Sequence, residues 1–170
     1  MKKISILIIF TVLVFYTQNS GAQNYTRAAG LRGGVSPGLI YRQYITEDEH
    51  AFEFLINIKE WKQMSLTALR LQFEPAQNTV SDNLWFGYGY GVHIGWDYSD
   101  NYTLLFNKFH FDNKAVSPIL GVDGYICLEY RVREFPLILG ADYKPYFEFS
   151  TRQFFGMSVG ELGFNIKVQF

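Results

Sequence analysis

Apolar and polar residues alternate with a period of two along most of the chain, and the alternation is cleanest between residues 157 and 170. One set of positions there is apolar: Leu162, Phe164, Ile166, Val168 and Phe170. The set between them is polar or small: Glu161, Gly163, Asn165, Lys167 and Gln169. Only a β-strand places alternate residues on opposite faces. The pattern therefore predicts that the chain closes with a strand that has one apolar and one charged face.

Seven earlier runs also predict strands, at 28–45, 52–59, 67–74, 86–97, 102–111, 120–132 and 137–149. The first run contains Gly33, Gly34 and Ser36-Pro37-Gly38, which predict a bend, a bulge or a turn. A turn would divide this run into two strands and change the strand count. The run 102–111 alternates poorly. With the run 28–45 counted as one strand, the pattern predicts eight strands.

The connections between these runs differ in length. Short ones lie at 60–63, 98–101 and 134–136, and longer polar ones lie at 75–83 and 150–156. Short turns at one end, longer loops at the other and an even strand count are typical of transmembrane barrels. A soluble sheet gives the same alternation, but the charged second face and the terminal Phe170 favour a membrane. We therefore predict an all-β fold, a single up-and-down antiparallel transmembrane β-barrel of eight strands.

Charged residues fall mainly on the face that we expect to point inward: Arg32, Arg42, Glu53, Arg70, Glu74, Asp97, Asp123, Glu129, Arg131, Asp142, Lys144, Glu148, Glu161 and Lys167. For 67–74 this assignment places Thr67, Leu69, Leu71 and Phe73 outward. The interior of an eight-stranded barrel is just wide enough for side chains to fill. Buried charges must pair, because an isolated one costs several kcal/mol. We expect an ion-pair network that plugs the lumen, with a proton or ion path as the alternative.

The amino-acid composition agrees with a membrane barrel. Aromatic residues make up 18 % of the chain, which the aromatic girdles of a membrane barrel would explain. Lys and Arg number 15 against 16 Asp and Glu, so there is no electrostatic footprint for nucleic acid. The mean hydropathy is −0.02, a value that a soluble protein and a barrel with a polar interior can share.

The N-terminus predicts a secretory signal peptide over residues 1–22. Lys2 and Lys3 provide the positive region, 4–16 the apolar region, and Ser20-Gly21-Ala22 a cleavage site after Ala22. The apolar region is shorter than the about 20 residues of a transmembrane helix, although an uncleaved anchor is an alternative. No Cys lies at the cleavage region for a lipoprotein anchor. Residues 23–170 would form the outer-membrane barrel domain.

Three features invite a chemical interpretation. The glycines of Gly87-Tyr-Gly-Tyr-Gly91 resemble a phosphate-binding loop, but they lie inside a predicted strand rather than before a helix. They instead make room for bulky neighbours, which we expect to be Tyr125 or arginine side chains. His93 and Asp97 share a face, yet four residues of strand span about 13 Å and prevent a direct hydrogen bond. Cys127, the single cysteine, is expected to be a buried filler.

A resemblance to a known class rests on the signal peptide, the alternating strands and Phe170, which look like the small OmpA/OmpX-type outer-membrane barrels. Four stretches are similar to a poorly characterised branch common in Bacteroidetes, and they span the chain: Gly30-Leu31-Arg32-Gly33-Gly34 with Gly38-Leu39-Ile40-Tyr41; 87–95; Gly121-Val122-Asp123-Gly124 with Leu128-Glu129-Tyr130; and Asp142-Tyr143-Lys144-Pro145. The resemblance implies contact with outer-membrane lipid. It also implies that assembly machinery recognises the C-terminal strand.

The resulting expectation is a non-enzymatic outer-membrane barrel with a structural, envelope-stabilising or surface-interaction role. It has no catalytic, cofactor-binding or metal-binding residues. Gly156-Met-Ser-Val-Gly160 matches the letters of a Gly-x-Ser-x-Gly elbow, but it leads into the predicted final strand and no helix follows it, as such an elbow requires. No zinc-spaced His pair occurs in the sequence. The alternatives are a membrane-embedded lipid-modifying enzyme, a small-solute channel, and a secreted lipocalin-like barrel that binds a hydrophobic ligand.

Overall fold

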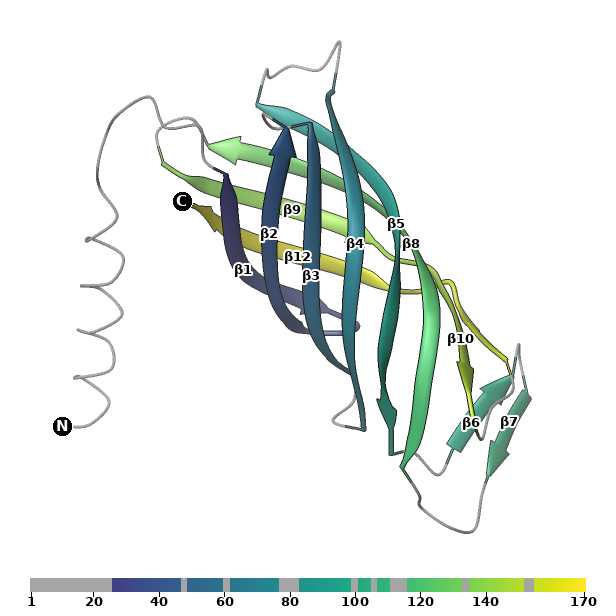
Figure 1. Cartoon of the computed structure of the whole chain (residues 1–170). Coiled ribbons are helices and arrows are strands. Elements are labelled where there is room, and N and C mark those ends of the chain that lie inside the picture. Colours follow the sequence, from purple (N-terminus) through teal and green to yellow (C-terminus); the bar gives the residue numbers. More distant parts are fainter. Residues whose placement is uncertain are drawn as a thin grey trace, which may run out of the picture.

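The structure is a computed structural model that describes residues 26–46, 49–59, 62–76, 83–98, 101–104, 107–110, 116–132, 135–151 and 155–170. The predicted signal peptide lies outside the described residues. The strands are β1 (Arg27–Gly34), β2 (Gly38–Thr46), β3 (His50–Lys59), β4 (Gln63–Pro75), β5 (Leu84–Asp97), β6 (Asn101–Leu104), β7 (Asn107–His110), β8 (Ser117–Val132), β9 (Leu137–Tyr143), β10 (Tyr146–Ser150), β11 (Gly156–Ser158) and β12 (Leu162–Gln169). They form a tilted barrel (Figure 1).

The sheet closes on itself, which confirms the predicted eight-stranded, up-and-down antiparallel β-barrel. Each of β1 to β4 pairs with the next strand along the chain, β5 pairs with β8, β8 with β9, β9 with β12, and β12 with β1. β10 pairs with the first part of β8 and β9 with the last part, so β9 and β10 are two segments of one barrel strand. β11 and β12 likewise make up the final strand, because they pair with β10 and β9 respectively.

The correct strand count results from two errors that cancel. The run 28–45 is two strands, because the chain turns at residues 35–37. Gly34 takes a φ of 117°, in the left-handed region that glycine tolerates best. The run 102–111 is not a barrel strand: β6 and β7 pair with each other in a separate two-stranded sheet. This hairpin lies near β10, at the end of the barrel away from the C-terminus (Figure 1).

These errors also misplaced several connections. Arg27 and Phe170 exchange backbone hydrogen bonds of 3.1 and 2.9 Å, so both ends of the barrel chain lie together. The 133–136 connection opens at this termini end, where Gln169 donates to the Pro136 carbonyl at 2.8 Å. Splitting the first run inverts the direction of β3, β4 and β5. The 60–62 connection and the 98–116 segment therefore leave the barrel at the opposite end, which we call the far end. The prediction that the short turns gather at one end of the barrel is thus wrong.

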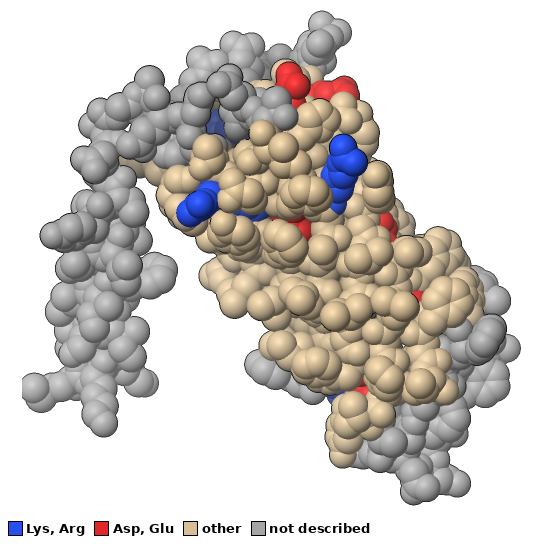
Figure 2. All heavy atoms as spheres, viewed as in Figure 1, with Lys and Arg blue, Asp and Glu red and all other residues tan. Residues whose placement is uncertain are grey.

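The outer face is apolar on nearly every strand. In β12 the predicted alternation is confirmed: Phe164 is 72 % exposed and Ile166 is 45 % exposed, while Asn165 and Lys167 between them are buried. In the space-filling view the surface is almost entirely uncharged (Figure 2). The protruding charged side chains in that view gather towards the upper end, near the start of β1 and the C-terminus (Figures 1 and 2).

Strand β4 is the exception, because its two faces are inverted relative to the prediction. Leu69, Leu71 and Phe73 are at most 1 % exposed and point inward, whereas Arg70 and Glu74 are exposed on the outside. The reason lies on the next strand. Gly91, Gly89 and Gly87 of β5 stand directly opposite Leu69, Leu71 and Phe73. Glycines on one strand thus leave room inside the barrel for the large side chains of the other.

The space beside the β5 glycines is therefore occupied by other side chains than the ones we expected. A Cβ at Gly87 would lie 2.6 Å from both Cys127 Sγ and Phe73, and one at Gly91 would lie 2.7 Å from Leu69. Apolar side chains, mainly from β4, take the space that we assigned to Tyr125 or arginine. Tyr125 and Cys127 belong to the same buried apolar cluster, so the inward position predicted for Cys127 is confirmed. This cluster closes one side of the lumen.

Candidate functional site

Two groups of ionic side chains fill the polar part of the lumen. The first is a quartet of Arg42 from β2, Glu53 from β3, Glu129 from β8 and Lys167 from β12, and all four side chains are fully buried. Arg42 donates to both oxygens of Glu129 at 2.8 and 2.7 Å and to Glu53 at 2.7 Å. Lys167 donates to Glu129 at 2.6 Å. Two cations and two anions balance, so the quartet is neutral as a whole.

Aromatic rings complete the environment of the quartet. The Arg42 guanidinium lies over the Phe73 ring at 4.4 Å and donates to the Tyr44 hydroxyl at 3.1 Å. Arg131 stacks over Trp85 at 4.0 Å on the same side of the lumen. Cation–π contacts of this kind strengthen when they are shielded from water. The quartet therefore ties four barrel strands together across the lumen.

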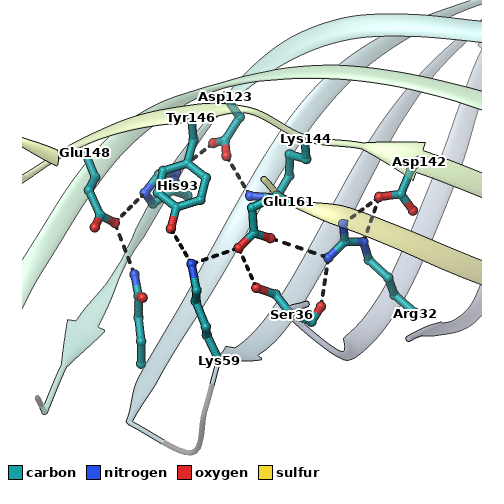
Figure 3. A network of polar contacts seen from close by, with 11 residues as sticks. Arg32, Ser36, Lys59, His93, Asp123, Asp142, Lys144, Tyr146, Glu148 and Glu161 are labelled. Carbon is teal, nitrogen blue, oxygen red and sulfur yellow. Dashed lines mark hydrogen bonds and ion pairs between the residues drawn. The ribbon is translucent and has the colours of Figure 1, made fainter. Parts of the chain in front are cut away.

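The second group, the far-end cluster, lies towards the 35–37 turn (Figure 3). Arg32 donates to one oxygen of Asp142 at 2.6 and 2.9 Å and to the Ser36 carbonyl at 2.8 Å. Glu161 accepts from the Ser36 hydroxyl at 2.8 Å and pairs with Lys59 at 3.0 Å. These contacts join β1 and β3 to the final barrel strand and explain why the 35–37 turn is held inside the barrel mouth.

His93 lies at the centre of the remaining far-end contacts. Its Nδ1 is 2.8 Å from Asp123, which also accepts from Lys144 at 2.8 Å, and its Nε2 is 3.6 Å from Glu148 (Figure 3). The Tyr146 ring stands edge-on to the imidazole with the ring centres 5.2 Å apart. Both imidazole nitrogens thus face carboxylates, an arrangement that anchors the ring.

A small polar cavity remains within the far-end cluster, lined by nine residues that include Asn57, Lys59, His93 and Glu161. Its volume is about 20 Å³, and a cavity needs about 10–15 Å³ to hold one water. Asn57 is 3 % exposed, and neither atom of its side-chain amide has a partner among the described residues. The cavity therefore matches about one bridging water and is far smaller than a ligand pocket of about 300–1,000 Å³.

The structure places most of the predicted inward charges inside the barrel, and only Arg70 and Glu74 are wrong. His93 does not pair with Asp97 through the strand, as the spacing predicted; it reaches Asp123 on the neighbouring strand, a partner that the sequence analysis missed. His93 stands opposite Gly121, and Asp123 stands opposite Gly91, so the two side chains meet diagonally. The inward glycines opposite His93 and Asp123 indicate that there is room for these side chains to meet, but this can be recognised only once the strand register is known.

Among the described residues, no group of three or more His, Cys, Asp or Glu side chains is placed to hold a metal ion. Within the same residues, no helix is long and apolar enough to cross a membrane. Comparison with known proteins gives no match to a family model, a curated protein or a solved structure. The fold and the lumen therefore define the class: a small closed antiparallel β-barrel whose interior is filled by apolar and ion-paired side chains.

Proposed function

We propose that the protein is a non-enzymatic outer-membrane β-barrel with a structural, envelope-stabilising or surface-interaction role. One observation carries the proposal, namely the inverted polarity of the barrel wall. Outward positions such as Phe164, Tyr90 and Val92 are apolar and exposed, while charged residues such as Arg42 and Lys167 are buried. A barrel in water would expose its charges. In a membrane the same wall buries its apolar face in lipid, and closure satisfies the backbone hydrogen bonds.

A secreted lipocalin-like binder needs an interior cavity for a hydrophobic ligand. The buried apolar cluster and the ionic quartet take that volume here. A small-solute channel needs a hydrated path, whereas the polar cavity matches about one water. The filled lumen therefore favours a closed barrel over both alternatives, and it supports a role that depends on the outer wall or the exposed connections.

A lipid-modifying enzyme would use a nucleophile activated by a base. Among the described residues no serine or threonine hydroxyl hydrogen-bonds to His93: the Ser36 hydroxyl donates to Glu161, and His93 is held between Asp123 and Glu148. Each group is committed to an ion-pair or hydrogen-bond partner, which favours anchoring over catalysis. The resemblance to OmpA/OmpX-type barrels agrees with this proposal. Under it, assembly machinery would recognise the C-terminal segment made up of β12 and the Phe170 that follows it.

Fractionation of producing cells tests the proposal directly. We expect cleavage after Ala22, recovery in the outer-membrane fraction, and release only by detergent. Unheated protein should migrate faster on a gel than boiled protein, because a closed barrel resists unfolding. Recovery in the periplasmic or culture fraction without detergent would refute the membrane location. A control membrane protein with known heat-dependent mobility shows that the fractionation worked.

A further inference from the structure

A hollow of about 720 Å³ opens on the outside of the barrel across β3, β4, β5, β8 and β10, and its lining is predominantly apolar. This volume falls within the about 300–1,000 Å³ range of small-molecule sites. Two rows of neighbouring residues form the hollow. Phe52, Arg70, Tyr90 and Gly124 make up one row, and Ala68, Val92, Val122 and Phe147 make up the other.

Small residues make the floor of the hollow. Ala68 and Gly124 replace the large outward side chains found at neighbouring positions, so the wall dips between Tyr90 and Phe147. Tyr90 is 66 % exposed and stands beside the dip. A Cβ added at Gly124 would lie 3.4 Å from Pro145, which is an ordinary contact. The backbone at Gly124 therefore does not require glycine for space, and a larger side chain there would fill the hollow.

Arg70 lies at one margin of the hollow and is exposed. Its side chain has no hydrogen-bond or ion-pair partner among the described residues. Outward positions of β4 are apolar from Met64 to Ala68 and polar from Arg70 to Glu74, in the direction of the termini end. Arg70 thus marks the boundary between the apolar belt and a polar rim. A guanidinium at such a boundary prefers a phosphate, which it can bind through two parallel hydrogen bonds.

We propose that this hollow binds one anionic phospholipid, with the phosphate at Arg70 and an acyl chain between Tyr90 and Phe147. The inference rests on the proposed membrane location. We take the termini end to face the periplasm, so that Arg70 lies in the phospholipid leaflet of the outer membrane. An acyl chain that starts at Arg70 then runs towards the middle of the apolar belt. The shape of the hollow selects the acyl chain, and the charge of Arg70 selects the anionic headgroup.

Native mass spectrometry of the protein purified in a neutral detergent tests the site. The probes are dioleoylphosphatidylglycerol and dioleoylphosphatidylcholine, which share acyl chains and differ in net charge. We expect one phosphatidylglycerol to bind at least about fivefold more tightly than phosphatidylcholine, because the choline cation of phosphatidylcholine repels Arg70 and offsets the attraction of its phosphate. Arg70→Gln should abolish this preference. Arg27→Gln is the matched control, because Arg27 is an exposed arginine that bonds Gln43 away from the hollow.

Variants that fill the hollow separate the contribution of its shape from the contribution of the Arg70 charge. Ala68→Leu and Gly124→Leu should weaken both lipids about equally, while heat-dependent gel mobility shows that they still fold. Equal binding of the two lipids by the wild type, or the same lipid preference in Arg70→Gln and Arg27→Gln, would overturn the site. Tighter binding of lipid A than of phosphatidylglycerol would overturn the assigned leaflet. Failure of the wild type to float with phosphatidylcholine vesicles would refute the membrane location itself, a result distinct from loss of the preference.

Discussion

Removing one carboxylate from the ionic quartet should destabilise the barrel strongly. Glu129 accepts from Arg42 and Lys167 at 2.6–2.8 Å, and all three side chains are fully buried. Glu129→Gln keeps the shape but leaves two cations facing the single carboxylate of Glu53. Breaking a buried ion pair typically costs about 3–5 kcal/mol, because a charge is left uncompensated. We expect a decrease of this size in the free energy of unfolding.

A double variant distinguishes charge balance from lost packing. Lys167→Met alone should also cost about 3–5 kcal/mol, since it leaves an excess carboxylate. Glu129→Gln with Lys167→Met restores neutrality around Arg42 and Glu53. The double variant should therefore lose at least about 2 kcal/mol less than the sum of the two single variants.

Urea titration of protein refolded in vesicles, followed by tryptophan fluorescence, measures these free energies. Glu148→Gln is the control: its side chain is 14 % exposed, it accepts from Gln63 at 3.1 Å, and it should cost no more than about 1 kcal/mol. Strictly additive losses for the Glu129 and Lys167 variants would refute the view that the quartet acts as one neutral unit.

Three further predictions test the wall and the far-end cluster. Leu71→Arg should cost about 3–5 kcal/mol in urea titration because it places an unpaired charge in the lumen, whereas Gln72→Arg on the outer face should cost little; similar losses would contradict the inverted faces of β4. Ile166→Arg should cost about 2–4 kcal/mol in vesicles if this position contacts the middle of the bilayer, and no cost would contradict lipid contact there. Gly121→Val should cost about 1–3 kcal/mol by overpacking against His93 and should shift the imidazole NMR signals; unchanged signals would refute the contact.

Sequence periodicity was sufficient for the strands whose two faces differ in chemistry. In β12 and β3 one face is apolar and the other carries polar or charged residues such as Lys167 and Glu53, so the faces followed directly from the alternation. In β4 the face with Leu69 and Leu71 is also apolar, yet it points into the lumen. Only the pairing with the β5 glycines decides this, and pairing is a property of register rather than of one strand.

The dependence on strand register also explains why the pairing of charged residues in the lumen could not be predicted. Alternation alone does not decide whether Gly34 and Pro37 bend one strand or separate two, and with one strand assumed there the directions of β3, β4 and β5 are reversed. The inward position of His93 followed from alternation, but Asp123 lies thirty residues away along the chain and becomes its partner only through the β5–β8 register. Charged residues could thus be placed on a face, whereas their pairing required the closed sheet.

The most direct test of the account is planar-bilayer recording on the purified monomer. The same preparation must float with phospholipid vesicles and show heat-dependent gel mobility, so that insertion and folding are established independently. Because the apolar cluster and the two ionic groups fill the lumen, and the polar cavity matches about one water, we predict no sustained conductance above that of the bare membrane. Well-defined, persistent channels from the inserted monomer would contradict the closed lumen and would indicate transport instead.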